Sequence, residues 1–135
     1  PINYYQTLVK EIDNEYIIDK KAYEIMEDSC EYYGSSYKGR LTAAKKILNS
    51  SYKIPIIIEE SENIIFFPTK SSLLEDCCWI NYNFIKKYDK NGKKVKVIFK
   101  NNEEIDIDMS KLSLENQISR SSMLELVSRK RKINK

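Results

Sequence analysis

The sequence predicts an α+β fold in which most of the β structure is antiparallel. Three observations lead to this: two apolar runs flank an acidic turn, an Asn-Gly pair separates further strand-like runs, and an apolar stripe at helical spacing occupies residues 37–49. A chain of 135 residues suits one domain. We expect residues 1–128 to form that domain and the basic residues 129–135 to be a mobile tail.

The N-terminal region, residues 3–28, predicts short strands or a mixture of strand and helix. Within it, Tyr16-Ile17-Ile18 favours a strand, and the run 22–26 is consistent with either state.

The runs 54–58 and 64–68 predict a β-hairpin around the acidic turn 59–63. Neither run alternates between apolar and polar residues, so we expect both faces of these strands to be covered. Pro55 and Pro68 bound the strands, where a missing N–H costs least.

A three-stranded meander follows. Asn91-Gly92 predicts a two-residue type I′ turn between the runs 79–88 and 94–100, with Tyr88 opposite Val95.

A three-residue loop at 101–103 predicts the third strand, with Val97 opposite Ile107 and Lys96 opposite Asp108. One face of the meander is then core, and the other carries neutralised charge pairs.

The helix predicted over 37–49 has Ser36 as a plausible N-cap. Its apolar stripe has the spacing i, i+4, i+7 and i+11 and consists of Tyr37, Leu41, Ala44 and Leu48. Lys38 and Lys45 share the next face and Lys46 lies beyond them, which leaves one basic side.

A C-terminal helical segment is predicted over 113–131, with Ser113 as its N-cap. Its apolar residues change sides: Leu114 and Ile118 share one face, whereas Met123, Leu126 and Val127 lie on nearly the opposite one. This pattern predicts a bend, two short helices, or one helix covered on two sides.

Charge is strongly segregated along the chain, although the net charge is only +3. Residues 1–33 carry three lysines and eight acids. Residues 34–58 carry five bases and no acid, and residues 109–135 carry seven bases and two acids. Two basic blocks on an acidic or neutral body are typical of a protein that binds a polyanion. The alternative is a solvated face and a ragged basic end.

Several kinds of chemistry are unsupported. The absence of histidine excludes Ser-His and Cys-His catalysis and imidazole metal ligands. Three cysteines, two of them adjacent, do not make a disulfide framework, and we interpret them as buried thiols in a reducing cytoplasm. No phosphate loop, dinucleotide fingerprint or metal-ligand cluster occurs, so we expect no enzyme, cofactor or metal.

The most informative stretch is Cys30-Glu-Tyr-Tyr-Gly-Ser-Ser-Tyr-Lys-Gly-Arg40, which opens the acid-free block. Locally it predicts a strand-to-helix turn capped by Ser36. The alternative is an anion site in which Ser35 and Ser36 hold a phosphate at the start of the helix.

This stretch, extended back to Ser29, resembles the signature of the ComK family of competence transcription factors. Three further stretches match in the same order: Pro55–Ile58 with Ile65–Thr69, then Cys78-Trp79-Ile80, then Ser113–Arg120. The resemblance covers roughly residues 5–125.

The resemblance implies a sequence-specific DNA-binding transcriptional regulator in the bacterial cytoplasm, associated with the nucleoid. Its expected partner is AT-rich double-stranded DNA at promoters of DNA-uptake genes, read largely through the minor groove. It also implies activation, homo-dimers or higher oligomers on DNA, and adaptor-guided proteolysis. The better-known members continue into a further C-terminal segment, which puts the adaptor contact and strong activation in doubt for this chain.

We expect the DNA contacts to come from both basic blocks, with Arg40 and Arg120 as the foremost. The serine hydroxyls position the backbone, and Tyr37 anchors the helix to the core. The candidate residues are Ser35, Ser36, Lys38, Arg40, Lys45, Lys46, Arg120, Arg129, Lys130 and Arg131.

Two other functions stay open. One is a protein-interaction module of the same fold without DNA binding. The other is a binder of single strands or RNA, in which tyrosines of the basic block stack on unpaired bases.

Overall fold

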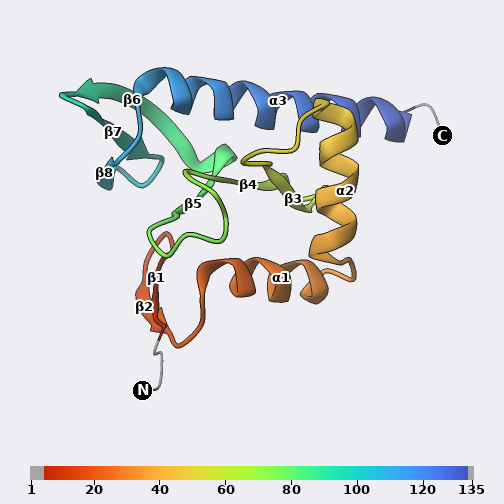
Figure 1. The fold of residues 1–135 in the computed structure, drawn as a ribbon, viewed down its shortest axis with the longest axis horizontal. Helices are drawn as coiled ribbons and strands as arrows, with labels where there is room; N and C mark the ends of the chain where they lie inside the picture. Colours follow the sequence, from red (N-terminus) through yellow and green to blue (C-terminus); the bar gives the residue numbers. More distant parts are fainter. Residues whose placement is uncertain (1–4, 134–135) are drawn as a thin grey trace.

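The computed structural model of the protein describes residues 5–133 and has an α+β fold, as predicted (Figure 1). The elements in chain order are β1 (Thr7–Lys10), β2 (Glu15–Ile18), α1 (Ala22–Tyr32), α2 (Tyr37–Leu48), β3 (Ile56–Glu59), β4 (Ile64–Pro68), β5 (Trp79–Asn81), a 3₁₀ turn (Tyr82–Phe84), β6 (Ile85–Asn91), β7 (Lys94–Phe99), β8 (Glu104–Ile107) and α3 (Lys111–Ile133). The strands form three antiparallel sheets, β1-β2, β3-β4-β5 and β6-β7-β8.

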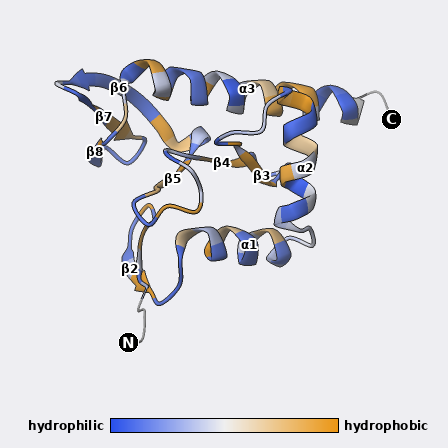
Figure 2. Cartoon of the chain, viewed as in Figure 1, coloured by the Kyte–Doolittle hydropathy of each residue, from blue (hydrophilic) through white to orange (hydrophobic). Residues whose placement is uncertain are grey.

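The three helices surround the central sheet in Figure 1. Helix α3 extends from the β6-β7-β8 sheet to the end of α2, and α2 connects this side to α1. The β1-β2 hairpin lies at the opposite corner from the C-terminal end of α3. Figure 2 shows that polar residues occupy much of the outer surface of the helices.

The hairpin β3-β4 forms as the apolar runs predict. Ile56, Ile57 and Ile58 are all buried, which confirms that both faces of β3 are covered. Pro55 immediately precedes β3 and Pro68 is the last residue of β4, so neither removes a hydrogen bond from the middle of a strand.

Helix α1 differs from the predicted strand-helix mixture, although β2 confirms the strand predicted at 16–18. Met26 and Cys30, four residues apart, are buried against the same core cluster as β3. One i, i+4 apolar pair in the sequence is weak evidence for a helix. Packing against β3 and α2 stabilises α1.

The predicted strand 79–88 is divided between two sheets. β5 pairs with β4, and β6 pairs with β7. Between them a 3₁₀ turn redirects the chain, and its start is capped by the Asn81 side chain, which accepts from the Asn83 N–H at 3.0 Å. The sequence does not reveal this break, because residues of both strands belong to buried clusters and the apolar run is continuous.

The registers of the meander differ from the predicted ones by two residues. Tyr88 pairs with Val97, and Val97 pairs with Ile105. The first turn consists of Gly92 and Lys93, with φ of +64° at Gly92, and not of Asn91 and Gly92 as a type I′ turn. Because side chains alternate with period two, the shift keeps the same face in the core.

Helix α3 is one continuous helix of 23 residues. Its start is capped by Ser110, whose Oγ accepts from the Ser113 N–H at 3.1 Å, so the predicted cap at Ser113 is wrong. The helix also includes residues 129–133, so the predicted tail continues the helix there.

The buried stripe of α3 spans both halves of the core. Leu114 packs in the cluster with β7 and β8, and Leu124 packs in the cluster with α1, α2 and β3. Between them the stripe is polar, with Gln117 and Ser121 buried. The predicted bend or pair of short helices is wrong, and the second side of α3 is not covered within the described residues, because Met123 and Leu126 are about half exposed.

Candidate nucleic-acid interface

The glycine-containing stretch connects two helices, not a strand and a helix as predicted. Helix α1 ends in a Schellman motif: the Gly34 N–H donates to the Glu31 carbonyl and the Ser35 N–H donates to the Cys30 carbonyl, each at 2.9 Å. Gly34 has φ of +83°, which a residue with a Cβ rarely adopts. The first glycine is therefore required by the turn.

Both serine hydroxyls are engaged within this connection. Ser36 is the N-cap of α2 and accepts from the Gly39 N–H at 3.0 Å, which confirms the predicted cap. The Ser35 hydroxyl donates to the Cys30 carbonyl at 3.1 Å. The local geometry is that of an ordinary cap, and phosphate contact at this helix end stays a prediction.

The basic residues of α2 lie on separate flanks. At about 100° per residue, Lys38 and Lys45 are nearly aligned, whereas Arg40 lies roughly 160° from Lys38. Lys38, Lys45 and Lys46 are all exposed, and none of them forms an ion pair within residues 5–133. These lysines form the solvated basic side of α2. As predicted, Tyr37 packs against the core, where its ring contacts Trp79 edge-on.

Arg40 points to the other flank and is paired with an acid. Its Nη1 lies 3.0 Å from Glu60 Oε1 in the β3-β4 turn, and its Nε donates to Ser35 Oγ at 3.4 Å. The Arg40 side chain is 24% exposed and that of Glu60 is 30% exposed. The expectation that Arg40 faces solvent free of an acid is wrong, because the β3-β4 turn carries Glu60 to the flank of α2.

Arg120 has four hydrogen bonds within the fold. Its Nη1 donates to the Lys53 carbonyl at 3.0 Å and to Gln117 Oε1 at 2.7 Å, and its Nη2 donates to the Tyr52 carbonyl at 2.8 Å and to Ser50 Oγ at 3.2 Å. Burial lowers its pKa from the ordinary value. Arg120 therefore joins α3 to the loop after α2 and is half-buried, and its contact with DNA stays a prediction.

Gln117 adds further hydrogen bonds between α3 and the rest of the fold. Its Nε2 donates to the Lys53 carbonyl at 2.9 Å and to the Pro68 carbonyl at 2.8 Å. It therefore joins α3 to the end of β4 as well as to the loop after α2. The available signal was a glutamine within the buried stripe of α3, where a polar residue requires partners.

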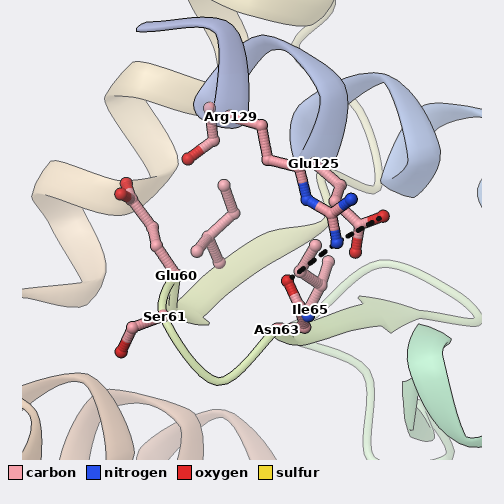
Figure 3. Close-up of a pocket in the computed structure, with 8 residues that line it drawn as sticks. Glu60, Ser61, Asn63, Ile65, Glu125 and Arg129 are labelled. Atoms are coloured by element: carbon pink, nitrogen blue, oxygen red, sulfur yellow. Dashed lines mark hydrogen bonds and ion pairs between the residues drawn. The ribbon is translucent and has the colours of Figure 1, made fainter. Parts of the chain in front are cut away.

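The three basic residues 129–131 lie on the last turns of α3 and are exposed. Arg129 extends from α3 toward the β3-β4 turn (Figure 3). Its Nη2 lies 3.4 Å from Asn63 Oδ1 in that turn and 3.7 Å from Glu125 Oε1 on α3. These groups border a cavity of about 240 Å³ whose wall includes Ile57, Ile65 and Ser128.

A second cavity of about 200 Å³ shares part of this wall and is bordered by Arg40, Glu60 and Arg131. The tertiary structure thus brings residues from the two basic blocks to one cavity between α2 and α3. Sequence reasoning missed Glu60 as the partner of Arg40 because it reads as a solvated acid in a turn.

Residues 5–133 contain no cluster of three metal-ligating side chains. None of the described helices is both long and apolar enough to cross a membrane. Cys30 and Cys77 are buried and Cys78 is exposed, and desolvation raises the pKa of each thiol.

A family model described as "ComK protein" matches residues 2–133. The chain belongs to the ComK family. Among curated proteins, the "Competence transcription factor" of Bacillus subtilis (strain 168) is 32% identical over 115 residues, which cover 84% of this chain. The match spans 60% of the length of that relative. No solved structure matches the chain.

Proposed function

We propose that this ComK-family chain binds AT-rich double-stranded DNA and regulates the transcription of competence genes. The observation that carries the proposal is the basic side of α2, where Lys38, Lys45 and Lys46 are exposed without an acidic partner. They lie in the acid-free block 34–58 of a family whose curated relative is named a transcription factor. A helix face of unpaired lysines suits a phosphate backbone, because each contact releases condensed counterions.

The proposed interface has two separate basic surfaces, this side of α2 and the end of α3, which lies toward the Arg40 flank of α2. Lys130 and Arg131 are exposed, and Arg131 reaches the cavity beside Arg40. Arg129 is 59% exposed and its contact with Glu125 at 3.7 Å is long, so it can exchange that contact for a phosphate. Narrow AT-rich minor grooves attract such side chains through their enhanced negative potential.

The same proposal includes cooperative binding of several copies to one promoter. It also places the protein at the nucleoid in the cytoplasm. Activation of the target genes is part of it as well. Adaptor-guided proteolysis rests on the family resemblance alone.

The proposal is tested by titrating the chain with an AT-rich duplex, a GC-rich duplex and a single strand at several salt concentrations. If about five phosphates are neutralised, log K on duplex falls with log salt at a slope of about −4 to −5. Lys45→Ala should reduce the magnitude of the slope by about one. Lys96→Ala is the matched control, because Lys96 lies 3.8 Å from Glu104 on the surface of the β6-β7-β8 sheet. Absence of duplex binding at low salt would rule the proposal out.

The single-strand arm tests the stacking alternative. Tyr32 is 83% exposed and Tyr52 is 64% exposed, which suits stacking on bases. Tyr32 is the last residue of α1 and Tyr52 follows α2, so the 12 residues of α2, about 18 Å, separate them. Adjacent bases could not stack on both, and we therefore favour duplex DNA. Tighter binding to the single strand would reverse this choice.

A further inference from the structure

The cavity between α3 and the β3-β4 hairpin has an apolar floor and a charged wall. Ile57 and Ile65 pair directly across the two strands, and both are buried residues of the floor. Figure 3 shows Glu125 and Arg129 extending toward them from α3. The cavity measures about 240 Å³. One water occupies about 30 Å³ in the liquid, so the cavity admits a solute much larger than water.

Glu125 carries a buried acceptor that the described residues do not satisfy. Its side chain is 19% exposed, and its Oε2 is buried without a hydrogen-bond partner within residues 5–133. The other oxygen, Oε1, lies 3.7 Å from Arg129 Nη2, which is long for an ion pair. A buried carboxylate oxygen without a donor is costly. A ligand ammonium would satisfy it best, because a hydrogen bond between two charged groups is stronger than one from a neutral donor.

Arg129 offers the opposite charge at the same cavity. Its side chain is 59% exposed, and a single nitrogen, Nη2, makes both of its described contacts, to Glu125 and to Asn63 Oδ1 at 3.4 Å. A guanidinium has five N–H donors in a planar fork. Arg129 can therefore bind a ligand carboxylate with two parallel hydrogen bonds.

The charges of the wall favour a ligand that carries both signs. Glu60, the third charged residue at this cavity, is already paired with Arg40. A ligand with only an ammonium group would separate Glu125 from Arg129 and leave the arginine without a partner. A ligand with only a carboxylate would do the same to Glu125, and a partly buried charge without its partner is costly. A zwitterion gives each residue a partner.

We infer that this cavity binds a free α-amino acid with an aliphatic side chain. The ammonium group contacts Glu125, the carboxylate contacts Arg129, and the side chain lies on Ile57 and Ile65. The ligand is small and stays partly in solvent beside Arg129, so the Kd is on the order of 1 mM. Arg129 is shared with the proposed DNA interface. Binding of the amino acid is therefore measured without DNA, and its failure leaves the DNA proposal standing.

The test is an NMR titration of the whole chain with three matched probes. L-leucine carries both charges, isoamylamine lacks the carboxylate, and 4-methylpentanoate lacks the amine. We expect L-leucine to bind about tenfold more tightly than either of the others. The methyl resonances of Ile57 and Ile65 should shift saturably, whereas Ile107, in the other core cluster, should not respond. No saturable shift at tens of millimolar L-leucine, or equal affinity for the three probes, overturns the assignment.

Two variants test the polar contacts. Glu125→Gln and Arg129→Gln each remove one charge of the wall, and each should weaken L-leucine binding about tenfold. Glu125→Gln should also abolish the preference for L-leucine over 4-methylpentanoate, which a purely structural role of Glu125 would not do. The matched controls are Glu115→Gln and Lys130→Gln, at exposed positions of the same helix outside the cavity. Unchanged affinity for L-leucine in either cavity variant overturns the assignment.

Far-UV circular dichroism and the melting temperature establish that the variants are folded. The titration of the parent chain with the three probes needs no variant, so it decides the question even if a substitution prevents folding.

Discussion

Arg40 Nη1 lies 3.0 Å from Glu60 Oε1, and this ion pair joins α2 to the β3-β4 turn. The most prominent basic residue of the acid-free block is therefore held on the flank of α2 that faces away from Lys38 and Lys45. The basic residues of α2 therefore have two different roles. Arg40 supports the packing of α2 on the hairpin, and the lysines on the other side are available to a polyanion.

Replacing Arg40 by Ala should affect folding more than DNA binding. Both side chains of the pair are less than one-third exposed, so we expect a loss of about 1 kcal/mol in the free energy of unfolding. The salt slope of duplex binding should change less than in Lys45→Ala. Urea unfolding and the salt titration measure the two effects. A slope reduced by about one in Arg40→Ala, with no change in Lys45→Ala, would show that the DNA contact lies on the Glu60 flank.

Replacing Arg120 by Ala should destabilise the protein by about 2–4 kcal/mol. The change removes the four hydrogen bonds that join α3 to the loop after α2, and the Lys53 carbonyl keeps only Gln117 Nε2 as its side-chain donor. Arg120→Lys should recover little, because an ammonium cannot reproduce the planar fork. The urea midpoint at constant m-value measures the loss. Lys130→Ala, at an exposed position of the same helix, is the control and should stay within about 0.5 kcal/mol of the parent.

The Ser36 cap and Gly39 should be energetically coupled. A Cβ at Gly39 would lie 3.0 Å from Ser36 Oγ, the atom that accepts the Gly39 N–H. Gly39→Ala therefore disturbs the hydrogen bond that caps α2. In a Ser36→Gly background this obstacle is absent, and Gly39→Ala should stabilise the helix by about 1 kcal/mol through its higher helix propensity. In the parent the gain should be smaller or reversed. A double-mutant cycle by thermal unfolding measures the difference, and equal effects in both backgrounds would contradict the coupling.

The three thiols should differ in access but share low reactivity at neutral pH. Cys30 and Cys77 are buried, so the native protein should expose one thiol to iodoacetamide and the denatured protein three. Desolvation raises the pKa of Cys78, which lowers its thiolate fraction at pH 7–8. Its alkylation should therefore be slower than that of a free peptide thiol and should rise about tenfold per pH unit below the pKa. Mass spectrometry of alkylated samples counts the sites, and a rate already constant by pH 8 would contradict the raised pKa.

Much of the local structure followed from the sequence alone. The β3-β4 hairpin, α2, its Ser36 cap and the core face of β7 were predicted because apolar spacing and capping chemistry act over a few residues. The same holds for the lysines on the solvated side of α2, which follow from helical periodicity. Pattern could not separate β5 from β6, because a continuous apolar run suits one long strand as well as two strands in different sheets.

Only the tertiary structure decided the registers of the meander and the partners of the two arginines. From Lys87 onward, a shift by two residues keeps each side chain on its face, so the apolar pattern is the same in both registers. Arg40 meets Glu60 across 20 residues, and Arg120 meets Lys53 across 67. The sequence therefore determined where positive charge is concentrated. The packing of α2 and α3 against β3 and β4 decided which of those charges are used within the fold and which remain for a partner.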